Sequence, residues 1–396
     1  MTINYQELVP KIRELAQAAS LRKRHHIHLM ETAWPVFSAW AGELNALRDL
    51  VDKAAAADPT GLRCARPISE ALDTRLISDT KVEAYVILAA DGSQILPDRH
   101  AEVYYGLINV GGIALPWGIE QPPTTTILSE LVYGDELENI SEARLALRRD
   151  MLERQMILRL GQEISSRCVA LSDGPLELWI GREGSETDRK DFQHSLELYF
   201  ELLEKLYEAR LLYAGYVDRP DSNYVVRLLE LAMAEEKKVA NFRTYHPLQG
   251  LSDADLYRQV LHPGERSAVF ALHSAAVDKY PLHSAICFFY MNVGTEKEPS
   301  LARVEIPSWM TQELDLINFL QSALAGQCRL TGVNTYPYVL HRAHELALVR
   351  LEEKEQVTRM ILSELQRMGL ETGRVSHKQA LKNLAVRSTG RLRRSK

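Results

Sequence analysis

The chain has 396 residues, more than the roughly 250–300 residues at which a single hydrophobic core stops growing. This length predicts two lobes, or one domain with helical additions. Hydrophobic residues make up 46% of the chain and charged residues 25%, which excludes a wholly disordered or fibrous protein. The net charge of −6 is not the strongly basic balance that is typical of a nucleic-acid-binding protein.

The charge is unevenly distributed along the chain. From Thr372 to Lys396 there are eight cationic side chains and no carboxylate, so this tail carries +8. The other 371 residues carry −14, because the total is −6. The tail after Gly373 has only scattered apolar residues, so we expect it to be flexible or to become ordered on binding. Its cations make it a candidate for contacts with phosphates.

The chain has four cysteines, Cys64, Cys168, Cys287 and Cys328. They are widely separated and form no CxxC pair, so we expect buried, reduced thiols and neither a zinc site nor a disulfide framework. The N-terminal segment alternates apolar and charged residues and lacks the apolar core of a signal peptide. No run approaches the ~18 apolar residues of a membrane span. We therefore expect a cytoplasmic protein.

A helical region is predicted for residues 1–56, where apolar residues recur every three to four positions. Within it lies a basic cluster, RKRHHIH, from Arg22 to His28. This cluster is either a solvated helix face or a contact with phosphates or a protein partner. Residues 57–80 contain prolines and a glycine, which predicts a connector.

The pattern then changes to strands. Three β-rich segments follow one another at residues 84–90, 102–115 and 124–133. Their short connections predict an antiparallel meander. From Glu142 to Ser166, apolar residues at spacings of four and seven predict a long amphipathic helix. A strand from Cys168 follows and breaks at Asp173-Gly174, so the order is β-β-β-α-β.

The C-terminal half alternates further strands and helices. Strands are expected at residues 211–217, 267–273, 284–293 and 302–309, and helices at residues 191–208, 314–325, 340–351 and 355–368. Another helix runs to about Glu236, and Asp221-Ser222 is the sequence expected to cap it.

Two Asp-Gly sequences are candidates for metal binding. Asp91-Gly92-Ser93 ends the first apolar strand, and Asp173-Gly174 ends the fourth. Carboxylates fixed at strand ends suit the divalent metals that bind phosphates. Each Asp-Gly pair alone predicts only a turn. Their places in the β-β-β-α-β order favour metal binding, because ribonuclease-H-like nucleases carry carboxylates on the first strand, the first helix and the fourth strand.

The long helix supplies the candidate for the third carboxylate. Glu153 lies at the edge of the apolar stripe and could turn toward neighbouring strand ends. It could equally be a surface residue paired with Arg149 or Arg154. Glu142 and Glu163 are the competing carboxylates of this helix.

A helix near the C-terminus carries two histidines. His341 and His344 lie three residues apart, hence on the same helix face, after Pro337. The sequence HRAHE does not have the spacing of the metalloprotease motifs HExxH and HxxEH, which disfavours a zinc protease. A histidine here is either structural or able to ligate a metal or transfer a proton.

Two polar turns are weaker candidates for phosphate contacts. One runs from Asp218 to Ser222 and precedes a helix, whose N-terminus could receive a phosphate. A plain helix cap at Ser222 would explain the same residues. The other contains Arg266, just before a strand.

Five segments, taken together and in order, resemble the NurA family of nucleases. They are AADGSQ (89–94), ALSDGPLELW (170–179), GYVDRPDSNYVVRLLELA (215–232), LHPGERSAVF (261–270) and YPYVLHRAHELA (336–347). The resemblance implies an α/β fold with a ribonuclease-H-like mixed sheet, a β-β-β-α-β core, flanking helices and an N-terminal helical extension. It places the nuclease core at residues 81–350. Outside the matched segments, we expect residues 1–80 to form a helical region and connector and residues 351–396 to form a C-terminal helix and basic tail. The apolar stripe of the N-terminal helices, and not the resemblance, makes them candidates for contacts with a second copy or a partner.

The resemblance also implies an activity. Family members are divalent-metal-dependent deoxyribonucleases, commonly using Mn²⁺, that degrade DNA from 5′ to 3′, with single-strand endonuclease activity in some. They typically form homodimers that dock on the hexameric ATPase HerA and resect DNA ends for recombination. Oxygen-rich sites accept Mg²⁺ as well.

The family's site residues carry over to this chain as Asp91, Glu153, Asp173, Tyr336 and His344. All but Tyr336 would bind the metal, and Tyr336 would orient the site or stack on a base. Two alternatives remain open. One is an inactive ribonuclease-H-like scaffold that binds DNA or loads a motor. The other is a metal-dependent nuclease of another type, such as a resolvase or transposase, that shares only the fold.

Overall fold

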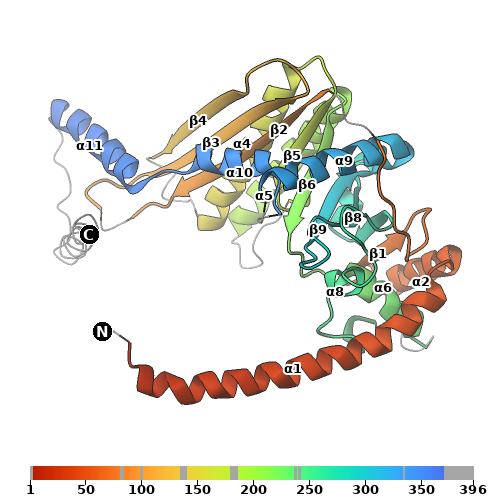
Figure 1. The fold of residues 1–396 in the computed structure, drawn as a ribbon. Coiled ribbons are helices and arrows are strands. Elements are labelled where there is room, and N and C mark those ends of the chain that lie inside the picture. The colour runs from red at the N-terminus through yellow and green to blue at the C-terminus, as the bar shows by residue number, and fades with distance from the viewer. Residues whose placement is uncertain are drawn as a thin grey trace. The chain divides into compact units, whose positions relative to one another are not determined.

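The computed structural model describes residues 3–80, 84–98, 101–133, 141–178, 186–235, 239, 242–332 and 335–369. The chain forms two compact units, each built from several segments (Figure 1). Unit 1 comprises Met1–Glu83, Leu171–Glu177 and Leu211–Tyr338, and unit 2 comprises Ala84–Ala170, Leu178–Arg210 and Val339–Lys396. The basic tail from Thr372 onward lies outside the described residues. None of the described helices is both long and apolar enough to cross a membrane.

Unit 2 contains the meander and the long helix that the sequence predicts. Its strands are β2 (Tyr85–Ile95), β3 (Gly106–Trp117) and β4 (Thr124–Val132), and its helices are α4 (Glu142–Gln162), α5 (Glu186–Glu208), nearly all of α10 (Tyr338–Ala347) and α11 (Leu351–Arg367). The pairs β2–β3 and β3–β4 are antiparallel, which confirms the meander. β5 (Cys168–Asp173) starts in this unit, where the backbone N–H of Val86 donates to the carbonyl of Arg167 at 3.0 Å. The order β2-β3-β4-α4-β5 confirms the predicted α/β fold class.

β2 is longer than predicted. It continues through Asp91-Gly92-Ser93 to Ile95 and pairs with β3 along its whole length. The prediction that the first strand ends at Asp91 was wrong, as was the alternative of an Asp-Gly turn. The pairing partner explains the difference, because Gly111 and Val110 of β3 stand opposite Asp91 and Gly92 and extend the ladder past the turn-forming pair.

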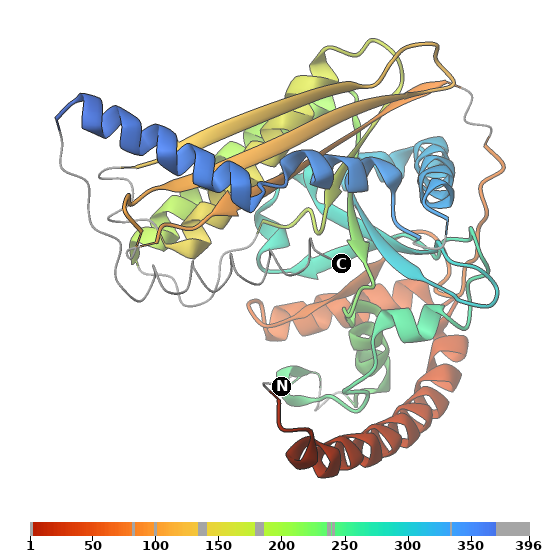
Figure 2. The ribbon, with the colours of Figure 1, turned by 60° about the vertical axis from the view of Figure 1, so that its left-hand side comes forward.

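Two adjacent glycines let helices pack on both faces of β3. A Cβ atom on Gly111 would lie 2.6 Å from Leu346 Cβ and 2.7 Å from the backbone nitrogen of Ala347, both in α10. A Cβ atom on Gly112 would lie 2.6 Å from Met156 Cγ of α4. Neighbouring residues of a strand point to opposite faces. α10 therefore covers one face of β3 and α4 covers the other (Figure 2).

α4 forms as its sequence pattern predicts. Ser141 caps its N-terminus by accepting a hydrogen bond from the backbone N–H of Arg144 at 3.2 Å. Leu145, Met156 and Leu160 of the predicted apolar stripe are buried. Helices of this kind are stabilised mainly by packing of the apolar face, and here that face covers the meander.

Unit 1 combines a sheet with several helices. Its strands are β1 (Arg63–Pro67), β6 (Leu212–Asp218), β7 (Phe270–Ser274), β8 (Ile286–Asn292) and β9 (Leu301–Pro307). Its helices are α1 (Tyr5–Trp40), α2 (Leu44–Ala57), α6 (Tyr224–Met233), α8 (Asp253–Tyr257) and α9 (Leu314–Leu330), with short 3₁₀ turns η1 (Phe242–Thr244), η2 (Val277–Lys279), η3 (Leu282–Ser284) and η4 (Ser308–Gln312). The strand order is β1-β7-β8-β9-β6, with the end of β5 beside β6. β8 and β9 are buried along their whole length and form the core of this unit.

The predicted connector at residues 57–80 contains a strand that the sequence analysis missed. β1 is five residues long and pairs antiparallel with β7. Its sequence, RCARP, has two arginines and a proline, so its composition does not indicate a strand. The strand forms because β7, some two hundred positions later in the chain, supplies its hydrogen-bonding partner.

α1 has two different halves. Its second half packs into unit 1 through Leu29, Met30, Ala33 and Phe37. Its first half is exposed, although it carries large apolar side chains, namely Tyr5, Leu8, Val9, Ile12, Leu15 and Leu21. The basic cluster from Arg22 to His28 lies between the halves and is mostly exposed.

The turn before α6 differs from its prediction. α6 begins at Tyr224 after Asn223, whose side chain makes no cap hydrogen bond; the backbone N–H of Val226 in the first turn donates instead to Asp253 Oδ1 at 2.8 Å. The predicted cap by Asp221-Ser222 was therefore wrong. The hydroxyl of Ser222 instead hydrogen-bonds the hydroxyl of Tyr290 at 2.9 Å, so this turn is tied to the core strand β8.

Arg266 is completely buried. Its Nη1 and Nη2 atoms donate to the two carboxylate oxygens of Glu70, at 2.9 Å each. The predicted phosphate contact of Arg266 was wrong, because its guanidinium forms an internal ion pair.

All four cysteines are free and buried, which confirms the prediction of reduced thiols. Burial raises the pKa of the thiols of Cys64, Cys168, Cys287 and Cys328 to about 12. The unreactive protonated form of each thiol therefore dominates.

Gly111→Ala should destabilise the protein more than Gly112→Ala. The new methyl group at position 111 meets the backbone of α10, which must move as a whole, whereas at position 112 it meets the side chains of Met156 and Leu160. We expect urea unfolding to show a loss of about 1–3 kcal/mol for Gly111→Ala and a smaller loss for Gly112→Ala. Equal losses would contradict the close packing of α10 on Gly111.

Candidate active site

Asp91 and His344 form a hydrogen bond on the α10 face of the meander. Asp91 Oδ2 lies 2.7 Å from Nδ1 of His344, and Asp91 Oδ1 accepts a hydrogen bond from the backbone N–H of Gly92 at 2.8 Å. The Asp91 side chain is 18% exposed and that of His344 is 62% exposed. A carboxylate that accepts a hydrogen bond from Nδ1–H orients the ring and leaves the lone pair of the neutral imidazole on Nε2. His344 can therefore bind a cation or exchange a proton through Nε2.

The position of His344 depends on how α10 ends. The carbonyl of Ala347, the last residue of α10, accepts hydrogen bonds from Ser93 Oγ at 2.5 Å and from Asn109 Nδ2 at 2.8 Å. Asn109 Oδ1 in turn accepts a hydrogen bond from Ser129 Oγ at 2.6 Å. Each of β2, β3 and β4 thus contributes one side chain to this arrangement. Because His344 lies one turn before Ala347, these bonds hold its ring in place.

Glu153 reaches β2 from the opposite face. A Cβ atom on Gly92 would lie 2.6 Å from Glu153 Oε1 and 2.6 Å from Arg149 Cγ, so a larger residue there would displace these two side chains. Arg149, one helical turn earlier, pairs with it, with 3.2 Å between Nε and Oε1. The Glu153 side chain is nevertheless only 15% exposed, so Glu153 is not the surface residue that the alternative interpretation described.

The surroundings of Glu153 favour a cation. Burial raises the pKa of Glu153 to about 8, and the negative charges of Asp150 and Asp91 add to the increase. The positive charges of Arg154 and Arg149 act in the opposite direction and do not cancel it. A further positive charge beside this carboxylate would favour its ionised form.

Each residue of the motif Asp91-Gly92-Ser93 makes a different contact with a helix. Asp91 and Ser93 point to the α10 face, where they contact His344 and the end of α10. Gly92 points to the α4 face and leaves space for Glu153. The motif therefore joins two helices to one point of β2.

The competing residues of the sequence analysis lie elsewhere. Glu142 and Glu163 are exposed at the two ends of α4. His341 pairs with Glu345, with 3.7 Å between Nε2 and Oε1. The structure thus brings Asp91 and His344 into contact on one face of β2 and places Glu153 beside the same strand on the other face, whereas Glu142, Glu163 and His341 lie elsewhere.

The other two predicted site residues belong to unit 1. Asp173 is the exposed last residue of β5, and Gly174 turns the chain with a φ of +95° while its N–H donates to the carbonyl of Tyr216 at 2.8 Å. The ring of Tyr336 stands edge-on to Tyr216, with 5.6 Å between centroids. The carbonyl of Tyr336 accepts a hydrogen bond from Thr331 Oγ1 at 3.0 Å.

The residues that support the site could not be recognised in the sequence. Ser93 was part of the quoted motif, but its bond to the end of α10 gave no local signal. In the sequence, Asn109 differs from its neighbours only in being a polar residue within an apolar strand, which does not indicate a contact with α10. Arg149 was considered solely as a surface partner of Glu153.

The donor atoms at the site suit a hard divalent cation. Within the described parts of the chain, no group of three or more His, Cys, Asp or Glu side chains is arranged to hold a metal ion. Asp91, Glu153 and His344 still supply carboxylate oxygens and an imidazole nitrogen, which Mn²⁺ accepts, and the raised pKa of Glu153 marks a site short of positive charge. Chemically, these residues fit a divalent cation.

Several solved structures are similar to this chain. The NurA nuclease from Sulfolobus solfataricus is 13% identical, with a TM-score of 0.45, over 84% of this chain and 97% of that chain. The catalytic domain of human endonuclease V is 11% identical, with a TM-score of 0.30, over 83% of this chain and 99% of that chain. Endonuclease V of Ciona intestinalis is 9% identical, with a TM-score of 0.29, over 72% of this chain and 89% of that chain. No curated protein matches the chain.

The family comparison covers the segment that contains all five predicted site residues. The model of the NurA domain matches residues 85–349, more than half of the chain. This match confirms the resemblance found in the sequence, and the chain belongs to the NurA family.

Proposed function

We propose that the protein is a divalent-metal-dependent deoxyribonuclease that hydrolyses phosphodiester bonds at DNA ends and in single strands. Membership of the NurA family supports a nuclease. The observation that carries the proposal is the contact between Asp91 and His344 on one face of β2, with Glu153 beside Gly92 on the other face of the same strand. Asp173 and Tyr336 are proposed to complete the site.

Each residue has a proposed role. Bound divalent ions, Mn²⁺ by preference and Mg²⁺ as an alternative, would neutralise the scissile phosphate and lower the pKa of an attacking water. Asp91, Glu153 and Asp173 would supply oxygen ligands. His344, held at Nδ1 by Asp91, would coordinate or exchange a proton through Nε2. Tyr336 would orient the site or stack on a base.

The wider role follows from the family. We propose that the protein degrades DNA from 5′ to 3′ during end resection in the cytoplasm, as a homodimer associated with a HerA-type ATPase. The exposed apolar side chains on the first half of α1 support a protein contact, because soluble proteins rarely leave such surfaces uncovered.

Asp91→Asn and Asp173→Asn should each abolish Mn²⁺-dependent DNA cleavage. Loss of a ligand should exceed the roughly 10–100-fold effects typical of residues that only support a ligand. Cleavage of labelled single strands, blunt duplexes and branched junctions, with Mn²⁺ and with EDTA, measures the loss. Thermal unfolding checks that the variants fold.

Three results would count against the proposal. Wild-type cleavage by a folded Asp91→Asn protein would remove Asp91 from the site. A preference for junctions would indicate a resolvase. DNA binding by a wild-type protein that cleaves none of the substrates would indicate a scaffold.

His344→Gln should slow cleavage by roughly 100-fold, because the group that coordinates or transfers a proton is lost. His341→Gln is the matched control on the same helix, since His341 pairs with Glu345 instead of Asp91. It should retain wild-type kcat. Equal losses in the two variants would show that the contact between His344 and Asp91 has no catalytic importance.

Removal of residues 1–24 should weaken dimerisation or ATPase binding. The cut must stop before Leu29, because Leu29, Met30 and Phe37 of α1 are buried, as are Leu47 and Val51 of α2. Light scattering after gel filtration measures the first property, and co-precipitation with a HerA-type ATPase measures the second.

A double substitution provides a control for this truncation. Leu8→Glu with Ile12→Glu removes apolar surface and leaves the helix in place, since both side chains are exposed. Unchanged mass and unchanged ATPase binding in both proteins would exclude the first half of α1 as a contact surface.

A further inference from the structure

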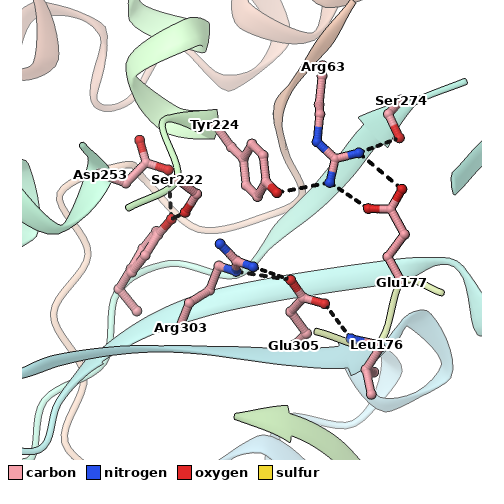
Figure 3. A network of polar contacts seen from close by, with 10 residues as sticks. Arg63, Leu176, Glu177, Ser222, Tyr224, Asp253, Ser274, Arg303 and Glu305 are labelled. Carbon is pink, nitrogen blue, oxygen red and sulfur yellow. Dashed lines mark hydrogen bonds and ion pairs between the residues drawn. The ribbon is translucent and has the colours of Figure 1, made fainter. Parts of the chain in front are cut away.

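A largely buried network of two arginines and two glutamates adjoins the chain segment that follows Asp173 (Figure 3). Arg63 Nη1 and Nη2 donate to the two carboxylate oxygens of Glu177, at 3.1 and 2.5 Å. Arg303 Nε and Nη2 lie 3.0 and 2.8 Å from Glu305 Oε1. Glu177, Arg303 and Glu305 are 4%, 6% and 1% exposed. We call these four residues the arginine–glutamate network.

Tyr224 joins the two ion pairs. The guanidinium carbons of Arg63 and Arg303 lie 5.0 and 5.1 Å from the centre of its ring. Arg63 Nη2 also donates to the Tyr224 hydroxyl at 2.9 Å, and Nη1 donates to Ser274 Oγ at 3.3 Å. The network is therefore one connected unit, anchored on β1, β7, β9 and α6 (Figure 3).

We call the segment Asp173–Glu177 the exit segment. Its beginning is fixed at Gly174, whose backbone N–H donates to the carbonyl of Tyr216 at 2.8 Å. A Cβ atom on Gly215 would lie 2.6 Å from the carbonyl oxygen of Gly174, so the close approach of these two backbones requires a glycine there. This contact orients the turn directly after Asp173.

The network holds the other end of the exit segment. Glu305 Oε2 accepts a hydrogen bond from the backbone N–H of Leu176 at 2.8 Å. The side chain of the next residue, Glu177, accepts two hydrogen bonds from Arg63. The exit segment is thus fixed on both sides of Pro175, whose ring already restricts φ.

Stability alone is a weak explanation for this network. Buried ion pairs can often be replaced by apolar residues of similar volume without loss of stability, because charges are costly to remove from water. Apolar side chains at positions 305 and 177, however, could not accept the Leu176 N–H or bind Arg63. The property that the charges add is a fixed backbone between Asp173 and Glu177.

We propose that the arginine–glutamate network is a positioning device for Asp173. It holds the exit segment in one conformation and so presents the Asp173 carboxylate in one orientation to the cation of the nuclease site. The inference rests on the proposed function. Arg63 and Glu305 act through the backbone and do not touch the cation or the DNA.

Arg63→Lys and Glu305→Gln test the proposal. Glu305→Gln keeps the side-chain length, Arg63→Lys keeps the positive charge, and each variant loses part of the network. Hydrogen–deuterium exchange of peptides that span residues 171–177 reports on the exit segment, and Mn²⁺ titration calorimetry without DNA reports on the site. We expect faster exchange and about tenfold weaker Mn²⁺ binding. In cleavage assays, the half-saturating Mn²⁺ concentration should rise and KM for DNA should stay the same.

Glu70→Gln is the matched control. Glu70 also forms a buried two-bond pair with an arginine of unit 1, Arg266, at 2.9 Å for each bond. It should lower the stability of the protein and leave Mn²⁺ binding and exchange of the exit segment at wild-type values. An equal effect of Glu70→Gln on Mn²⁺ binding would show that general destabilisation explains the results, and would overturn the proposal.

Arg63→Lys decides the outcome if Glu305→Gln does not fold, because it retains the positive charge at a side chain that is 27% exposed. Wild-type exchange and wild-type Mn²⁺ binding in folded Arg63→Lys would overturn the proposal. A wild-type protein that neither binds Mn²⁺ nor cleaves DNA would contradict the proposed function instead. The exchange measurement would still decide whether the network holds the exit segment.

Discussion

The carbonyl of Ala347 accepts two hydrogen bonds from side chains of the meander, and the candidate site in unit 2 depends on them. The last carbonyls of a helix have no partner within the helix. Here Ser93 and Asn109, 254 and 238 positions away in the chain, supply the missing donors. The bonds determine where α10 ends against the strands. His344 then faces Asp91, and Gly111 allows the helix to lie close enough for that contact.

Local patterns in the sequence were enough to predict most helices and strands. They failed where pairing with a distant strand determines the local structure. The meander and α4 follow from periodicity and were predicted correctly. β1 was missed because its stability comes from β7. The two Asp-Gly pairs show the limit most clearly. Asp173-Gly174 ends a strand, with Gly174 at a φ of +95°, whereas Asp91-Gly92 lies within a strand because β3 continues opposite it.

The same limit applies to the candidate site. Asp91 and His344 stand in short motifs, so a sequence can point to them. The side chains that hold them cannot be found this way, because the bonds of Ser93 and Asn109 to Ala347 join distant parts of the chain. Arg63 and Glu177 are likewise 114 positions apart. A pattern within a few residues carries no information about such pairs.

The two groups of buried charges differ in their balance, and this difference separates their roles. In the arginine–glutamate network, two guanidinium groups face two carboxylates, and every acid has its own base. Such a network is complete without a cation and can hold the chain in the same way before and after one binds. Around Glu153, burial and two carboxylates outweigh two arginines, and its pKa rises to about 8. A carboxylate in that state gains most from an added positive charge. The balanced group therefore suits a support, and the unbalanced group suits the proposed cation site.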